Sequence, residues 1–145
     1  MYSIGKNIGI LNRQFNIFLN HELAGTELNA TEFMYIGYLY QHDGIMQDDL
    51  AKEFLVDRAA ITRTLKNMEE KGFVERIRSK EDGRERRIYL TKKACSYKEL
   101  AESIQKKYIQ AAGDMLNCQK QQEIEETVSF MVGLIKNINQ NLKEV

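Results

Sequence analysis

The residue types that could do chemistry in this chain are arginines and lysines gathered near its middle. Residues 58–93 carry 12 cations and six anions, a local charge of +6, although the whole chain has 21 charges of each sign. The rest of the chain therefore sums to −6. A basic patch on an otherwise acidic chain is typical of a protein that holds a polyanion. A solvated charged surface would give the same count, so the positions of the cations must decide.

Several of these cations lie on a predicted helix that begins after Asp57, a suitable N-cap, and reaches Lys71 before Gly72. Ile61, Leu65 and Met68 share one face of this helix, and small, polar and basic side chains lie nearly opposite. A short helix over 47–54 and a tight turn precede it, which is the layout of a helix-turn-helix. The residues expected to contact DNA here are Arg58, Ala59, Thr62, Arg63 and Lys66.

Each of these side chains suits a different contact. Ala59 allows close approach, and Thr62 can bond to a phosphate or to a base edge. Arg63 can pair bidentately with guanine, whereas Lys66 suits a phosphate. An ordinary amphipathic surface helix would share the pattern, so the element that follows carries part of the argument.

After Gly72 the hydrophobic period changes to that of strands. Runs over 73–78 and 87–90 flank a polar loop with Asp82 and Gly83, which predicts a β-hairpin. Such a hairpin beside a groove-reading helix would act as a wing, because its tip can follow phosphates or place an arginine in the minor groove. The cations of this wing are Arg78, Lys80, Arg84, Arg86 and Arg87.

The remaining pattern is helical. Asn29 and Glu32 form a capping box for a helix that ends near Asp43 and Gly44, and Thr91 caps a long helix over 92–116. Helices over 3–23 and 120–143 carry heptad seams, which need a partner helix in the same chain or in a second copy. The seam residues are Ile4, Ile8, Leu11, Phe15 and Phe18 in the first helix and Ile124, Val128, Met131, Ile135, Ile138 and Leu142 in the last. The fold class is thus mainly α with a small β-hairpin wing.

The motifs resemble those of the MarR family of winged helix-turn-helix transcription regulators over almost the full length. The similarity is carried by LNATEFMYIGYL, GIMQDDLAKEF, VDRAAITRTLKNMEEKGFVER and DGRERRIYLT, whose Asp82 and Arg84 match the family's wing pair. The resemblance implies one domain over 1–145, with a winged helix-turn-helix lobe at 29–94 and dimerisation helices in 1–28 and 95–145. It also implies a homodimeric repressor of a pseudo-palindromic operator, released by a small aromatic or anionic ligand.

A ligand site is predicted at Arg13, a cation on an otherwise apolar and amide-rich helix, with Tyr35 and Tyr38 as aromatic walls. The alternatives are an exposed Arg13, or one paired with a carboxylate across the dimer, and tyrosines that pack in the core or the interface. A phenol or carboxylate would be the effector.

The sequence offers little to other kinds of protein. Cys95 and Cys118 lack metal-ligand spacing, and His21 and His42 are unpaired, so no metal or cofactor is expected and the cysteines are expected to be free. No phosphate-binding glycine loop or nucleophile constellation indicates an enzyme. With no long apolar run, we expect a soluble, cytoplasmic protein that binds no membrane. The competing function is a helical protein-interaction module that does not bind DNA.

Overall fold

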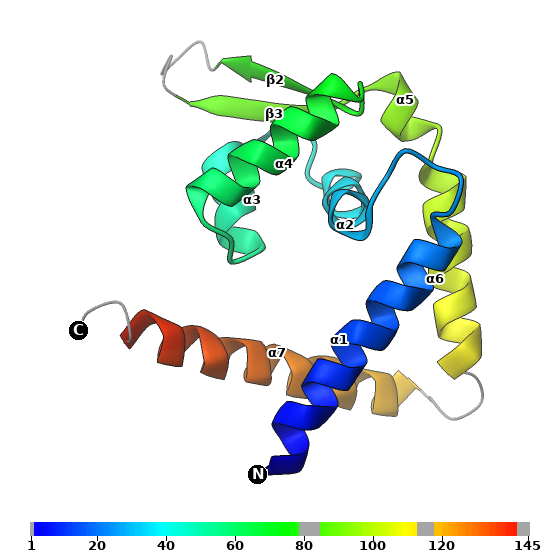
Figure 1. Cartoon of the computed structure of the whole chain (residues 1–145), viewed down its shortest axis with the longest axis vertical. Coiled ribbons are helices and arrows are strands. Elements are labelled where there is room, and N and C mark those ends of the chain that lie inside the picture. Colours follow the sequence, from blue (N-terminus) through cyan, green and yellow to red (C-terminus); the bar gives the residue numbers. More distant parts are fainter. Residues whose placement is uncertain (1, 79–84, 113–117, 142–145) are drawn as a thin grey trace. The chain divides into compact units, whose positions relative to one another are not determined.

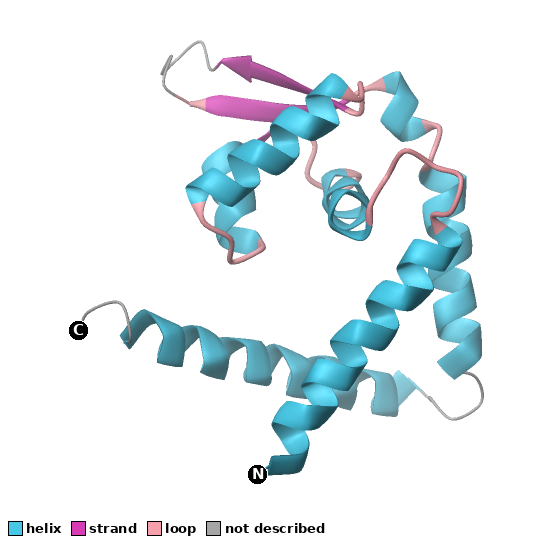
Figure 2. Ribbon diagram, in the orientation of Figure 1, coloured by secondary structure: helices cyan, strands magenta, loops and turns pink. Residues whose placement is uncertain are grey.

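The computed structural model describes residues 2–78, 85–112 and 118–141. It divides into two compact units, residues 1–104 and 105–145, and each is described by itself. Figure 1 labels the helices and the strands β2 and β3, and Figure 2 distinguishes helices from strands by colour. Their bounds are α1 Tyr2–Glu22, α2 Ala30–Leu39, β1 Ile45–Met46, α3 Gln47–Glu53, α4 Arg58–Glu70, β2 Val74–Arg78, β3 Arg86–Leu90, α5 Lys92–Cys95, α6 Lys98–Ala112 and α7 Cys118–Asn141. The predicted class, helices with a small β-hairpin wing, is confirmed.

The helix starts follow from their capping residues. At α2 the Asn29 side chain accepts from the Glu32 backbone N–H at 2.9 Å, and the Glu32 carboxylate accepts from the Asn29 N–H at 3.0 Å, so the predicted capping box forms. Asp57 caps α4 by accepting from the Ala60 N–H at 2.7 Å. Met46 gives α3 no side-chain cap.

The described strands form one antiparallel sheet in the order β1-β3-β2. Ile45 lies opposite Ile88, and Val74 opposite Leu90. Gly44 precedes β1 with φ of +80°, and a Cβ there would lie 2.9 Å from the Tyr89 ring. Both the backbone conformation and the space therefore require glycine at this entry to the sheet.

The core of the first unit lies between α4, the sheet and the surrounding helices. Figure 1 shows α3 beside α4 and β2 beside β3; α4 contacts α3 and β2, and β2 contacts β3. The carboxyl end of α1 belongs to this core, whereas its amino end is exposed. The central buried side chains are Leu19, Leu23, Ile36, Leu39, Leu50, Ile61, Leu65, Met68, Phe73, Val74, Ile88 and Ile104.

Two predicted helices end earlier than the sequence pattern indicated. The helix expected over 92–116 is two helices, because the chain turns at Ser96 and carries Tyr97 edge-on against the buried Phe73, with ring centroids 5.3 Å apart. The helix starting after Asn29 ends at Leu39 rather than near Asp43. Asp43 instead accepts from the Leu90 backbone N–H at 2.7 Å, which holds the segment after α2 against β3.

The second unit contains the carboxyl-terminal part of α6 and the whole of α7. No side chain described in α7 is buried, and many of its apolar residues are about half exposed. Within the described parts of the chain, no helix has both the length and the apolar character needed to cross a membrane.

Candidate nucleic-acid interface

Helix α4 presents one buried face and one exposed ridge. Ile61, Leu65 and Met68 are fully buried, as predicted. The predicted contact residues are all exposed, opposite the buried face; they are Arg58, Ala59, Thr62, Arg63 and Lys66. Glu70 continues this ridge and forms an ion pair with Lys66 at 3.6 Å. The amino-terminal two turns of the ridge are therefore small or basic, and the last turn is acidic.

The flank of α4 that faces α3 and the sheet is held by polar contacts. Gln47 donates from Nε2 to the Thr62 hydroxyl at 2.8 Å, and that hydroxyl donates to the Arg58 carbonyl at 2.6 Å. Arg58 forms an ion pair with Asp48. Because the proton of Thr62 is already donated within the protein, this hydroxyl is best suited to accept a hydrogen bond from an incoming group.

Farther along the same flank, Glu69 accepts from the Arg76 Nε at 2.8 Å and from the Arg76 backbone N–H at 3.2 Å. This contact joins the last turn of α4 to β2. The hydrogen bond from the Arg76 side chain lowers the pKa of Glu69 below its ordinary value of 4.5, against an opposing effect of burial. Arg76 is thus engaged in the fold.

The opposite flank is held by Glu32 of α2, whose side chain is 0% exposed. The Glu32 carboxylate accepts from the Asn67 Nδ2 at 2.7 Å and from the Lys71 Nζ at 2.8 and 2.9 Å. The sequence had identified Glu32 only as a capping residue. No local signal marks its contacts with α4, because 35 residues separate it from Asn67.

The cations predicted on the wing have different positions. Arg78 and Arg86 pair across β2 and β3 and are exposed. The half-buried Arg87 donates from Nη1 to the Gly44 carbonyl at 3.0 Å. That contact ties β3 to the entry of β1 and uses one N–H group of Arg87, so the contact of Arg87 with DNA stays a prediction. Lys80 and Arg84, together with Asp82 and Gly83, lie outside the described residues.

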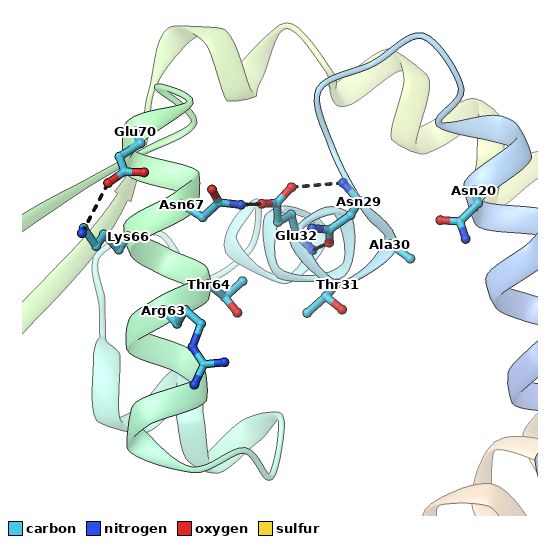
Figure 3. Close-up of a pocket in the computed structure, with 10 residues that line it drawn as sticks. All are labelled: Asn20, Asn29, Ala30, Thr31, Glu32, Arg63, Thr64, Lys66, Asn67 and Glu70. Carbon is cyan, nitrogen blue, oxygen red and sulfur yellow. Dashed lines mark hydrogen bonds and ion pairs between the residues drawn. The ribbon is translucent and has the colours of Figure 1, made fainter.

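An open pocket of about 650 Å³ lies beside α4. Figure 3 shows Arg63 and Thr64 of α4 on one side, the start of α2 in the middle and Asn20 of α1 on the other side. Its lining residues are Asn20, Asn29, Ala30, Thr31, Glu32, Arg63, Thr64, Lys66, Asn67 and Glu70. Arg63 and Lys66 therefore line the pocket as well as forming the exposed ridge.

The predicted ligand residues do not line this pocket. Tyr35 is 2% exposed and packs against Phe54 with ring centroids 4.5 Å apart, and burial raises the pKa of its phenol. Tyr38 is half-buried and stacks on His42 at 4.0 Å. Arg13 is exposed on α1. Tyr35 is thus a core residue, and the prediction that it forms an aromatic ligand wall is corrected.

The seam residues are exposed in the chain taken alone. Ile4, Ile8 and Leu11 of α1 are 42 to 61% exposed. The corresponding residues of α7 are similarly exposed, except that Met131 is half-buried and Leu142 lies outside the described residues; the exposed ones are Ile124, Val128, Ile135 and Ile138. Phe15 and Phe18 instead pack partly against the core. Each unit therefore carries an exposed apolar surface, on α1 in the first unit and on α7 in the second.

The described residues hold no cluster of three or more side chains of the kinds that bind metal ions. Cys95 is a free, exposed thiol, and the side chain of Cys118 is not among those described.

Comparison with known proteins adds independent findings. The family model of the MarR family matches residues 28–85. The chain is 33% identical over 116 residues to the uncharacterized HTH-type transcriptional regulator YdgJ of Bacillus subtilis strain 168, covering 80% of this chain and 69% of that protein. It is 27% identical over 93 residues to the uncharacterized HTH-type transcriptional regulator YybA of the same strain, covering 64% of this chain. The match spans only 62% of the length of YybA.

Solved structures share the fold. A MarR transcriptional regulator from Methanosarcina mazei Go1 superposes with a TM-score of 0.81 at 23% identity, covering 95% of this chain and 99% of the other. A mutant of MarR from E. coli, crystallised with operator DNA, superposes with a TM-score of 0.77 at 23% identity, covering 89% of this chain and 93% of the other.

Proposed function

Because the chain belongs to the MarR family, whose members are transcriptional regulators and not enzymes, we propose that it binds duplex DNA by placing α4 in the major groove. The observation that carries this proposal is the exposed ridge of α4. Ala59, Arg63 and Lys66 project outward, while polar contacts hold both flanks of the helix against α3, the sheet and α2. A rigid helix with a basic exposed face suits groove reading.

The proposed contacts follow from side-chain chemistry. Arg63 would donate two hydrogen bonds to guanine, and Lys66 would contact a phosphate. The Thr62 hydroxyl would accept a hydrogen bond from a base. It could donate to a phosphate oxygen only if it gave up its bond to the Arg58 carbonyl. On the wing, Arg86 together with Lys80 and Arg84 would follow the phosphates or enter the minor groove. Arg87 would contact DNA only through the N–H groups that do not bond the Gly44 carbonyl.

We further propose a cytoplasmic homodimeric repressor assembled through α1 and α7. Their exposed apolar seams support this assembly, because a stable soluble helix buries such a stripe against a partner. Two-fold symmetry would present two copies of α4 to half-sites about 34 Å apart on a pseudo-palindromic operator.

The pocket beside α4 supports release of the operator by a small anionic ligand. Arg63 and Lys66 would attract a carboxylate or phenolate, and the same two side chains form the proposed DNA-contacting ridge. A ligand held by Arg63 would therefore compete with guanine for one guanidinium. Arg13 remains a second candidate anchor, exposed on α1.

The first experiment selects operators from a random duplex pool and then measures affinity across salt concentrations. For a DNA-binding protein, the logarithm of the binding constant falls with the logarithm of the salt concentration, with a slope of about −0.9 for each phosphate neutralised. A protein-interaction module would select no sequence and would show a flat line.

The second experiment tests the ridge with Arg63→Ala. We expect operator affinity to fall by about 1–3 kcal/mol, with relaxed base preference at one position of each half-site. Lys98→Ala, which removes one exposed positive charge from α6, is the control and should leave base preference unchanged. An Arg63→Ala variant that binds the operator like the unaltered chain would reject the ridge as the reading surface.

A third experiment screens small carboxylates and phenols for release of the bound operator. If the ligand still releases the Arg63→Ala variant from a duplex that this variant binds, that result contradicts competition at Arg63.

A further inference from the structure

The buried carboxylate of Glu32 has more contacts than its capping role requires. The capping box uses one bond from the Asn29 N–H to Oε2. The other three bonds come from α4 and from the residue that ends it, and Figure 3 shows Asn67 reaching Glu32 from α4. A fully buried carboxylate is stable only when its oxygens are satisfied in this way, so the contact holds the two segments in one geometry.

The two donors lie in line with the proposed reading residue. Arg63, Asn67 and Lys71 are spaced four residues apart, so they follow one another along the same side of α4. Glu32 therefore bonds Asn67 and Lys71, which lie one and two turns after Arg63 on the same side. A shift of these bonds would rotate or tilt Arg63 against a base edge.

The end of α4 is also joined to the segment that links α1 to α2. Lys71 donates to the Glu27 carbonyl at 2.8 Å. Lys93 donates to the Lys71 carbonyl at 2.8 Å and to the Glu27 carboxylate at 2.7 Å. These bonds keep Lys71 in place, and its side chain is only 28% exposed beside the fully buried Glu32 carboxylate.

We propose that Glu32 is a positioning residue that sets the orientation of α4 in the major groove and thereby the base preference of Arg63. The proposal rests on the proposed function, since it concerns how the same helix reads DNA. Glu32 touches no DNA in this scheme; it acts through Asn67 and Lys71.

The test is Glu32→Gln, which keeps the size of the side chain but replaces one acceptor oxygen with an NH₂ donor. That donor would face the donors of Asn67, Lys71 or Asn29, so at least one contact must break. Charge and positioning predict opposite effects. Removing a negative charge should strengthen binding to a polyanion. A misoriented helix should weaken binding to the selected operator.

We expect Glu32→Gln to bind the selected operator about tenfold more weakly, as for loss of one base contact, and to bind random duplex equally or more tightly. Glu99→Gln, the same change at an exposed position of α6, should leave operator affinity unchanged. Ile36→Val, a destabilising change in the core one turn along α2, should also leave operator affinity unchanged when it is measured well below the unfolding temperature. Asn67→Ala keeps the ion pair between Glu32 and Lys71 and tests the same contact if Glu32→Gln fails to fold. It should lower the preference for operator over random duplex.

The outcomes separate the two proposals. If the unaltered chain shows no sequence preference, the proposed function fails and this inference fails with it. If the unaltered chain prefers its operator and Glu32→Gln and Asn67→Ala keep that preference, only the positioning role is overturned. Equal losses for Glu32→Gln and Ile36→Val would also overturn it, because Glu32 would then act through stability alone.

Discussion

The helix that faces DNA in our proposal and the last helix of the chain are built in opposite ways. One face of α4 is fully buried and its flanks are bonded to α2, α3 and β2. In α7 no described side chain is buried, and apolar residues cover much of the surface. Helix α4 is therefore held by contacts within the first unit, whereas in our proposal a second copy of the chain buries the α7 seam.

Helix α1 combines both designs along its length. Leu19 near its carboxyl end and Leu23 just after it belong to the core, and its amino end exposes Ile4, Ile8 and Leu11. The same helix is thus anchored in the winged helix-turn-helix lobe at one end and exposes an apolar surface at the other. In our proposal, DNA reading and assembly use different surfaces, so substitutions can abolish one without the other.

The largest effect is expected from charges placed in the α7 seam. The double variant Val128→Lys and Ile135→Lys puts two cations at positions that are about half exposed in the single chain. We expect a monomer with a folded lobe, and an operator affinity about 10²- to 10⁴-fold lower because two linked half-site contacts become one. Analytical ultracentrifugation and fluorescence anisotropy measure the two effects.

Gln122→Lys with Ser129→Lys is the matched control, because a rotation of 100° per residue places both on the opposite side of α7. It should leave the assembly intact. A seam variant that still dimerises would show that α7 is not part of the interface.

The second effect comes from shortening a leucine in each region. Leu65→Ala, at a fully buried position of α4, should lower the free energy of unfolding by about 2–5 kcal/mol. Leu134→Ala, at a 49% exposed position of α7, should cost much less in the monomeric background. Urea unfolding of both variants measures the difference, and equal losses would contradict the description of the two regions.

The sequence predicted these regions unequally. The buried row of α4, the Asn29 capping box and the end of α4 before Gly72 are local patterns, so they were predictable and they are confirmed. The family resemblance, now supported by the comparisons, supplied the winged helix-turn-helix arrangement.

What the sequence missed depends on long-range packing. The break between α5 and α6 exists because Tyr97 reaches Phe73, and Arg87 is engaged because Gly44 lies beside β3. Tyr35 looked like a ligand wall because helical spacing alone does not distinguish a core face from a cleft. Glu32 shows the same limit, since its capping bond is local and its bonds to Asn67 and Lys71 are not.

A smaller effect should depend on pH. The hydrogen bond from Arg76 lowers the pKa of Glu69 in the folded chain, so this carboxylate stabilises the fold at pH values above its ordinary pKa of 4.5. That contribution is lost as the pH falls through the lowered folded pKa. Because the Glu69 side chain is 39% exposed, solvent screening keeps the contribution below about 1 kcal/mol.

Glu69→Gln should therefore destabilise the chain at pH 7 and match the unaltered chain at pH values below the folded pKa, as measured by urea unfolding. The control is Glu75→Gln, an exposed glutamate on β2. A Glu69→Gln loss that is the same at both pH values would reject the ionised pair as its cause.

The smallest effect is expected in the turn between α3 and α4. Both helices end in the same motif, in which the residue after the C-cap has positive φ and the next backbone N–H reaches back five residues. After α4 that residue is Gly72, with φ of +75°, but after α3 it is Leu55, with φ of +53°. Leucine in this conformation carries a cost of about 1–2 kcal/mol that glycine avoids.

Leu55→Gly should relieve that cost, but glycine also gains freedom in the unfolded chain and the partly covered leucine loses its contacts. We therefore expect a net stabilisation of about 0.5 kcal/mol, seen as a higher unfolding midpoint in urea. Gly72→Leu is the reverse change at the matching position, where a Cβ meets nothing closer than 4.0 Å, so its loss reports the backbone cost less the freedom that the unfolded chain gives up. If Leu55→Gly destabilises while Gly72→Leu costs the expected amount, the Leu55 side chain contributes more to the turn than its backbone strain removes.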